Sequence, residues 1–501
     1  MHLKLSPFWF LFGSTHRRFL LPVSLLALSA CAIGPDFKAP ELPFVTEGWS
    51  QAEAKPETPI SANSEPVTPE TKWLTRFADP MLLHFLEVAR AQNFSLKEAQ
   101  AKVEEVAALR QVALSNLNPE IGLGAEYRRS KESNTLALFP GGIIESRYSV
   151  GAQLSWEIDL FGRIRRDAEA ARAELGSALA AEQGAQLSIL SQVAAQYIAL
   201  RTAQHRLVAA RGNLEAATAS LALTEKRFSA GLSSELDVLR AKSLASEVEA
   251  GIPALESAEH VSRQQLEVLL GQSTESLKSE LSILQDLPQP DSLPELGLPS
   301  ELLRRRPDLL VAEHALAADT ARVGVAIGTL FPKFSLTGEL GFRSATQGTL
   351  FNDPSEVFAI APGFSWPILS WHNLMAKVDA ADARMRQKLA AYQNAVLSAV
   401  AEVEGALTSY RNLIRKRQHI ETLLAANRRA AQLASQQYHE GLIDFIDKLE
   451  VDRALFSAEE QAVAVRGEIA QQFITLCKAL GGGWQLPTPQ TEQTSQAQEN
   501  V

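Results

Sequence analysis

Two stretches that contain no proline constrain the fold of this chain more than any other feature. One stretch runs from Gly141 to Ile252 and the other from Ile368 to Leu486, although the chain has 24 prolines. Proline removes a backbone donor and clashes with the preceding turn of a helix. Its absence over two such lengths predicts very long helices.

The two stretches also repeat each other at an offset of about 210 residues. The segment RFSAGLSSELDVLRA (227–241) aligns with QYHEGLIDFIDKLEV (437–451). Four pairs of identical residues coincide: Gly231 with Gly441, Leu232 with Leu442, Asp237 with Asp447, and Leu239 with Leu449. We therefore expect an internal tandem duplication in which each repeat is a helical hairpin, with its tip near 229–235 or 439–445.

The helix before the first tip carries a heptad pattern. A large apolar residue recurs at every seventh position and an alanine follows three positions later: Leu200, Leu207, Leu214, Leu221 and Phe228, with Ala203, Ala210 and Ala217. This is the a/d seam of a left-handed coiled coil. The roughly 68 residues from Gly162 to Ser229 predict a rod of about 100 Å, which is too long for the core of a globular domain.

The N-terminus has the features of an export signal. Residues 1–30 contain the basic residues Lys4, Arg17 and Arg18 before an apolar run, and Leu28-Ser29-Ala30-Cys31 resembles a lipobox. We expect Cys31 to become the acylated N-terminus, with chains such as palmitate. Because Ala32 and not aspartate follows it, the outer membrane is the expected location. The alternative is an ordinary secretory signal with a chance cysteine.

Residues 31–78 are expected to form a lipid-anchored extended arm that leads into the folded part of the chain. Cys31 and Cys477 are the only cysteines. With Cys31 acylated, no disulfide within the chain is possible. Cys477 lies on an apolar helical face and is expected to be packed and unreactive.

Four segments alternate apolar and polar residues with a period of two: 120–128, 146–158, 333–343 and 357–368. Strands of about ten residues have the length that crosses a bilayer at a tilt. Aromatic residues near the strand ends suit an interfacial girdle: Tyr127, Tyr148, Trp156 and Trp366. The alternative, half-buried strands of a soluble sandwich, does not explain these aromatics.

Four strands cannot close a barrel, and open strand edges have no backbone partners in lipid. We therefore expect the chain to insert as an oligomer. Three copies bring together about twelve strands, the smallest closure with a lumen wide enough for solutes. A homotrimer is the expected assembly.

Four motifs carry a resemblance to a known family: GPDFKAP (34–40), WEIDLFGRIRR (156–166), the segment 297–342 that contains RRRPDLL, and LCKALGGGW (476–484). Together they resemble the outer-membrane factor (TolC-like) family, in particular its NodT-type lipoprotein branch. The resemblance covers essentially the whole mature chain. It implies an α+β, mainly α fold, in which a trimeric α-barrel of coiled-coil hairpins joins a transmembrane β-barrel with four strands per protomer.

The resemblance also implies an order of domains along the chain. Residues 79–271 form the first repeat and 302–480 the second, each with a helix, two barrel strands and a long hairpin. Residues 272–301 form an equatorial connector, and 481–501 a C-terminal tail.

The function that the resemblance implies is passage, not chemistry. The trimer is a channel-tunnel in the outer membrane of a Gram-negative bacterium that spans much of the periplasm. It docks onto a periplasmic adaptor and a resistance-nodulation-division transporter of the inner membrane, and conducts drugs or toxic compounds outward. The alternatives are the channel of a type I protein secretion system and, with less support, a periplasmic adaptor.

In the family the hairpin tips meet the adaptor, which implies that the matching residues dock it here: Arg227, Gly231, Leu232, Ser233, Tyr438, Gly441, Leu442 and Ile443. The alternative for each glycine is a plain helix stop. Acidic residues beside the tips are candidates for the periplasmic gate, as rings of like charge that favour cations: Glu235, Asp237, Asp444 and Asp447. The alternative is a solvated helix face. In the family, aspartates often lie just before the tip, whereas this chain has Asn427, Arg428 and Arg429 there. The sequence therefore does not decide which residues form the gate.

No catalytic or metal-binding pattern emerges from the sequence. The nine histidines lack ligand spacing, and there is no HExxH motif. We expect no enzyme activity, cofactor or metal, and the net charge of −10 disfavours nucleic acid as a partner. Arg304-Arg305-Arg306 suggests an anion site, but we expect Asp308 to cap a helix there instead.

Overall fold

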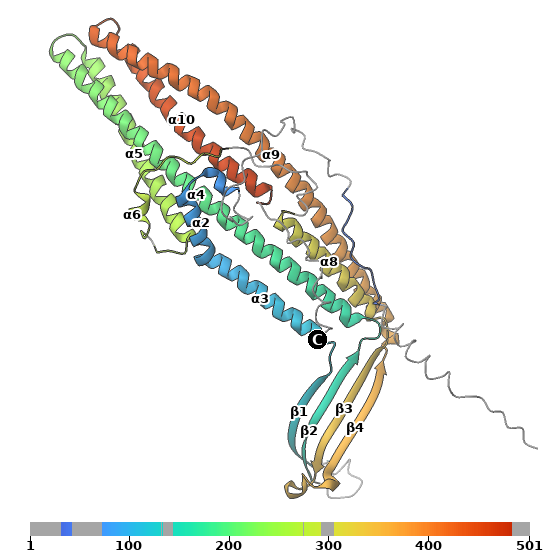
Figure 1. Cartoon of the computed structure of the whole chain (residues 1–501). Helices are drawn as coiled ribbons and strands as arrows, with labels where there is room; N and C mark the ends of the chain where they lie inside the picture. Colours follow the sequence, from blue (N-terminus) through green and yellow to red (C-terminus); the bar gives the residue numbers. More distant parts are fainter. Residues whose placement is uncertain are drawn as a thin grey trace, which may run out of the picture. The chain divides into compact units, whose positions relative to one another are not determined.

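The computed structural model describes residues 32–42, 73–131, 133, 144–273, 275–291 and 305–482. These residues belong to two compact units (Figure 1). Of the described residues, the first unit comprises those within 32–40, 104–177 and 312–391, and the second those within 41–103, 178–311 and 392–482. The export signal and Cys31 lie outside the described residues.

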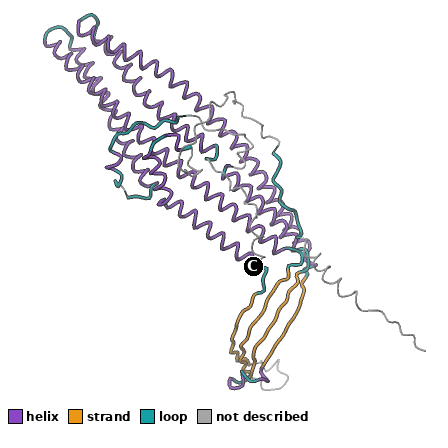
Figure 2. Tube along the Cα trace, viewed as in Figure 1, coloured by secondary structure: helices purple, strands orange, loops and turns teal. Residues whose placement is uncertain are grey.

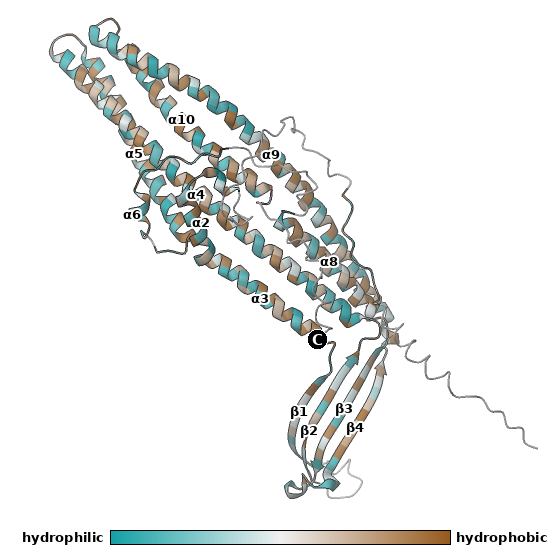
Figure 3. Cartoon of the chain, in the orientation of Figure 1, coloured by the Kyte–Doolittle hydropathy of each residue, from teal (hydrophilic) through white to brown (hydrophobic). Residues whose placement is uncertain are grey.

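The first unit contains one antiparallel sheet, with strand order β1-β2-β3-β4 (Figure 2). The strands are β1 (Glu120–Lys131), β2 (Ile144–Ile158), β3 (Lys333–Ser344) and β4 (Glu356–Ser365). Hydrophobic and hydrophilic residues alternate over much of β1, β2 and β3, whereas residues 357–361 of β4 are all hydrophobic (Figure 3). The 3-10 helices η3 (Gln347–Thr349) and η4 (Asp353–Ser355) lie between β3 and β4.

The last strand is shorter than the sequence predicts. β4 ends at Ser365 and not at 368, and the 3-10 helix η5 (Ile368–Ser370) follows. A proline alone does not stop the ladder, because β4 pairs through Pro362 opposite Leu336. The other strands differ from prediction by up to three residues at their loop ends.

Four long helices form two hairpins. α4 (Arg163–Ser229) returns as α5 (Glu235–Leu269), and α9 (Trp371–Glu440) returns as α10 (Phe445–Ala479). Proline does not end the return helix of the first hairpin, because α5 runs through Pro253. Pro253 lies on the exposed side of α5, and buried Leu244 and Leu266 anchor the helix on either side of it.

Shorter elements complete the two units: η2 (Leu74–Phe77), α2 (Pro80–Gln92), α3 (Phe94–Ser115), α6 (Lys278–Leu281) and α8 (Pro307–Gly328). The carboxylate of Asp79 starts α2 by accepting hydrogen bonds from the amides of Met81 and Leu82, at 2.9 and 3.0 Å. Asp308, which the sequence predicts as a cap, is the second residue of α8. It lies inside the first turn, where its carboxylate accepts two hydrogen bonds from Arg306.

The second unit has its main core where η2, α2, α4, α5 and α10 meet. Phe77 packs edge-on against Phe473, with ring centroids 5.3 Å apart. The hydroxyl of Tyr197 donates to Asp79 at 2.8 Å, and burial raises the pKa of Tyr197. This hydrogen bond ties the start of α2 to the middle of α4.

The predicted heptad seam is buried over only part of α4. Leu200, Ala203 and Leu207 are buried, whereas Phe228 is 45% exposed. Closer to the tip, Asn213, Ser220 and Thr224 take the buried positions around Ala217. At Ser220 the polar side chain meets a partner on α10, since the Lys448 ammonium donates to the Ser220 hydroxyl at 3.0 Å.

No helix within the described ranges is both long and apolar enough to cross a membrane. Over the same ranges, histidine, cysteine, aspartate and glutamate nowhere gather in a group of three that could hold a metal ion.

Candidate functional site

The two hairpin tips close with the same backbone geometry. At the first tip, Gly231 has φ +73° and its amide donates to Phe228 O, while the Leu232 amide donates to Arg227 O. At the second tip, Gly441 has φ +79°, and its amide and that of Leu442 donate to Tyr438 O and Gln437 O. Each tip is a Schellman motif, in which glycine adopts the left-handed conformation at low cost.

The leucine after each glycine points into solvent. Leu232 is 67% exposed and Leu442 is 68% exposed. In many Schellman motifs this residue packs back on its own helix. Here the two tips, which lie at the same end of the second unit (Figure 1), each present an uncovered apolar side chain.

Arg227 and Tyr438 join the two hairpins at their tips. The Arg227 guanidinium lies 4.7 Å from the centroid of the Tyr438 ring, and its Nη1 donates to Tyr438 O at 2.9 Å. Tyr438 is buried, and its ring packs against Phe445 at 5.6 Å. The sequence placed both residues at the tips but did not predict that they meet.

A small core supports this contact. Residues from both hairpins make it up: Ala217, Ala241, Leu244, Ala245, Tyr438, Phe445 and Leu449. Ile443 packs against its edge. The two tips are thus packed against each other through apolar side chains.

Asp237 is held in a capping box at the start of α5. Its carboxylate accepts from the Ser234 amide at 3.1 Å and from the Ser234 hydroxyl at 2.8 Å, while the Asp237 amide donates back to the Ser234 hydroxyl at 3.2 Å. The Ser233 hydroxyl donates to the same carboxylate at 3.2 Å. Burial raises the pKa of Asp237, but these hydrogen bonds outweigh it and hold the pKa below its usual range.

The second tip lacks this box because Asp444 stands where the first tip has Ser234. Asp444 is the N-cap of α10, and its side chain makes no capping hydrogen bond. Asp444 and Asp447 are both exposed, as is Glu235 at the first tip. The four acidic residues thus divide into one engaged carboxylate, Asp237, and three that face solvent.

Sequence reasoning missed a buried charge pair close to the tips. Lys448 and Asp452, one turn apart on α10, form an ion pair, and their side chains are 7% and 14% exposed. Lys448 is aligned with Val238 of the first repeat, so the duplication gave no sign of a buried charge. Its spacing of three and four residues from Phe445 and Asp444 was the available signal.

The polar residues before the second tip bind within their own hairpin. Arg428 pairs with Glu459 at 3.2 Å, and the Asn427 amide donates to Ala454 O at 3.0 Å. Both contacts join α9 to α10.

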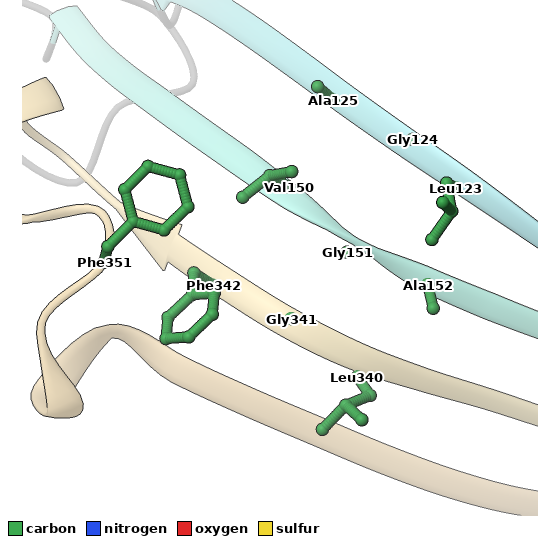
Figure 4. A pocket seen from close by; sticks show the side chains of 10 residues that line it. All are labelled: Leu123, Gly124, Ala125, Val150, Gly151, Ala152, Leu340, Gly341, Phe342 and Phe351. Atoms are coloured by element: carbon green, nitrogen blue, oxygen red, sulfur yellow. The ribbon is translucent and has the colours of Figure 1, made fainter.

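The sheet of the first unit presents one apolar face. An open groove of about 490 Å³ lies on it, floored by Gly124, Gly151 and Gly341, which pair across β1, β2 and β3. In Figure 4 Phe351 lies beside Phe342 at one end of the groove, and their ring centroids are 5.6 Å apart. The side chains that the sequence assigned to the apolar side of these strands line this groove.

The predicted girdle aromatics make matched contacts. Trp156 Nε1 donates to Leu117 O at 3.0 Å, and Trp366 Nε1 donates to Leu330 O at 2.9 Å. Each tryptophan thus ties a strand to the end of the helix that precedes its strand pair. Tyr127 and Tyr148 pack together with ring centroids 4.6 Å apart.

A family model described as outer membrane efflux protein matches residues 85–272 and 298–482. The toluene efflux pump outer membrane protein TtgF of Pseudomonas putida is 30% identical over 463 residues, which cover 92% of this chain and 95% of the relative. The pyoverdine export outer membrane protein OpmQ of Pseudomonas putida is 30% identical over 475 residues, covering 94% and 98%.

Solved structures agree with these matches. A structure of the outer-membrane channel OprN superposes with a TM-score of 0.84 and 33% identity, and covers 91% of this chain and all of that chain.

Proposed function

Since the chain belongs to the outer membrane efflux protein family, we propose that it is the outer-membrane channel-tunnel of a tripartite efflux pump. It conducts drugs or toxic compounds passively, and neither catalysis nor a cofactor enters its work. The observation that carries this proposal is the pair of matched tips, each with an exposed leucine at the same end of a long helical unit. Such tips suit a partner that binds by helical hairpins.

We propose that the copies of the trimer contact one another through the edge strands of the sheet. β1 and β4 are the edge strands of the four-stranded sheet, and within the described residues each is paired on one side only. Unpaired backbone groups are too costly in lipid, so β1 of one copy pairs with β4 of the next. Three copies then close one barrel, with the apolar groove face toward lipid and the opposite face toward the lumen.

The docking surface for the periplasmic adaptor comprises the exposed Leu232 and Leu442 with Ser233 and Ile443 beside them. Gly231 and Gly441 shape the turns, and Arg227 and Tyr438 hold the two tips in register. An inner-membrane resistance-nodulation-division transporter supplies the cargo. TtgF is named for toluene and OpmQ for pyoverdine at equal identity to this chain, which supports a conduit that does not itself select cargo.

The periplasmic gate lies at the same tips. In the trimer Asp444, Asp447 and Glu235 form rings of like charge whose repulsion favours opening and whose field favours cations. Asp237 is the weakest of the four candidates, because its carboxylate already serves the capping box. The clasp between Arg227 and Tyr438 opposes opening by holding the hairpins together.

The location is the outer membrane, where Cys31 carries the lipid anchor. The lipobox and the position of Ala32 support this assignment.

Single-channel conductance in a planar bilayer, measured together with the mass of the protein in detergent, tests the proposal. A trimer with a small, mostly closed conductance is expected. Neutralising Asp444 and Asp447 together should change both the open fraction and the cation preference. A monomer that never inserts contradicts the channel assignment.

A further inference from the structure

Two motifs that the channel function leaves unexplained meet in the first unit. The segment 34–40 begins three residues after Cys31, the proposed lipid anchor, and 156–166 spans the end of β2 and the start of α4. More than a hundred residues separate them in sequence. In the structure Arg166, from the second motif, grips the chain just before and within the first.

The contacts of Arg166 are directed at backbone carbonyls. Its Nε donates to Ile33 O at 3.1 Å, and its Nη2 donates to Gly34 O at 3.1 Å and reaches Ala32 O at 3.5 Å. The guanidinium also binds the carboxylates of Asp36 and Glu169, each at 2.7 Å. The Arg166 side chain is only 4% exposed. A buried guanidinium with five acceptors fixes the path of the segment that supplies them.

Glycines let the backbone of this segment approach its neighbours closely. Gly34 has φ +107°, and a Cβ there would lie 2.4 Å from the Cα of Gly324 on α8. A Cβ on Gly162 would lie 2.7 Å from the Cα of Ala32. The Ile33 amide donates to Phe161 O at 3.2 Å. Residues 32–34 are therefore seated between α8 and the turn that joins β2 to α4.

The contacts of Arg166 with residues 32–36, which we call the clamp, fix the position of the chain next to the anchor. Cys31 directly precedes Ala32, and one residue spans at most about 3.6 Å. We propose that Arg166 is a positioning residue for the lipid anchor, which forces the acyl chains on Cys31 to enter the membrane beside the base of β2. This inference rests on the proposed acylation of Cys31. It implies that the anchor sets the depth at which the sheet inserts.

The test compares three full-length chains: wild type, Arg166→Gln, and a chain with four Gly-Ser residues inserted between Cys31 and Ala32. The insertion adds slack but leaves the clamp intact. Each chain is made with acylated Cys31 and as Cys31→Ser behind an ordinary secretory signal. Arg386→Gln is the matched control, because it removes an exposed ion pair to Asp382 in the same unit. The readouts are trimer recovered in the outer membrane, intact mass, and amide exchange at Ile33.

With the anchor present, Arg166→Gln and the insertion should each lower the recovered trimer severalfold, and the control should not. In the Cys31→Ser chains, Arg166→Gln should have no further effect, because no anchor remains to be positioned. Only Arg166→Gln should speed exchange at Ile33.

An equal loss of trimer from Arg166→Gln with and without the anchor overturns the inference and leaves a purely structural clamp. Unchanged recovery in both the Arg166→Gln and insertion chains also overturns it. If intact mass shows no acyl group on Cys31 in the wild type, there is no anchor to position and the inference is also overturned. Channel conductance of the same sample then shows whether the proposed function survives.

Discussion

The Arg227 guanidinium covers the ring of Tyr438 at 4.7 Å and donates to the carbonyl of the same residue at 2.9 Å. The two residues belong to different repeats and lie 211 positions apart. One side chain thus binds both the ring and the backbone of the helix end opposite.

Replacing Arg227 with glutamine should raise the open fraction of the channel. The change removes a cation–π contact worth about 1 to 2 kcal/mol and a charge-assisted hydrogen bond, so the two hairpins separate more readily. Single-channel recording checks the outcome. Arg211→Gln is the matched control, since Arg211 pairs with Glu256 inside the first hairpin at 2.9 Å. Equal conductance of Arg227→Gln and wild type would show that this contact does not hold the gate.

The capping difference between the tips predicts opposite effects of two substitutions. Ser234→Ala removes the capping box of α5 and should cost about 1 kcal/mol. Asp444→Ser places the Ser-x-x-Asp pattern at the start of α10 and should stabilise the protein by a similar amount or less. Denaturant titration in detergent measures both. A loss of stability in Asp444→Ser would mean that Asp444 already contributes more than the missing cap.

The periodicity and the duplication of the sequence predict the helices, turns and strands of this chain, but not which side chains contact one another across the repeats. The two Gly-Leu turns and the four strands follow from local rules, because glycine conformation and side-chain alternation are properties of the segment itself. Pro253 shows where such a rule fails: a proline on an exposed helix face is tolerated when packing on either side holds the helix.

The clasp at the tips shows the other limit. Arg227 aligns with Gln437, and Tyr438 with Phe228, so the two repeats do not supply the same pair twice. Only the packing of one hairpin on the other brings Arg227 to Tyr438. Likewise Asp237 and Asp447 occupy matching positions in the two repeats. The residue three positions earlier, Ser234 or Asp444, decides whether the carboxylate is engaged in a capping box.

Cys477 should be unreactive in the folded protein. Its side chain is 2% exposed, and burial raises the pKa of the thiol, so little thiolate is present at neutral pH. A maleimide reagent should label it only after unfolding. Leu442→Cys, at an exposed tip position, is the positive control and should react at once. Labelling of native Cys477 would show that the helix α10 opens locally around it.

The contact between Arg306 and Asp308 should weaken as the pH falls. Burial raises the pKa of Asp308, but the hydrogen bonds and charge of Arg306 outweigh it and hold the pKa below its usual range. The stabilisation is therefore present above the unfolded-state pKa of about 3.9 and is lost as the pH falls through the lower folded-state pKa.

Because the Asp308 side chain is 57% exposed, we expect this stabilisation to be below about 1 kcal/mol. Wild type and Asp308→Asn, unfolded by denaturant across this acidic range, should differ at the upper end and converge at the lower end. A difference that grows with acidity would contradict the sign of the shift.

Removing one member of the buried pair of Lys448 and Asp452 should lower the free energy of unfolding much more than replacing both members with apolar residues. Lys448→Met leaves Asp452 without its cation at a site where that side chain is 14% exposed, and should destabilise the protein by about 3 to 5 kcal/mol. The double variant Lys448→Met, Asp452→Leu removes both charges and should recover most of that loss. Lys416→Met is the control, because Lys416 and Glu468 form an exposed pair whose loss should cost under about 1 kcal/mol. Denaturant unfolding of the four proteins gives the comparison. If the double variant is no more stable than Lys448→Met alone, the Ser220 contact of Lys448, and not the unpaired charge, accounts for the loss.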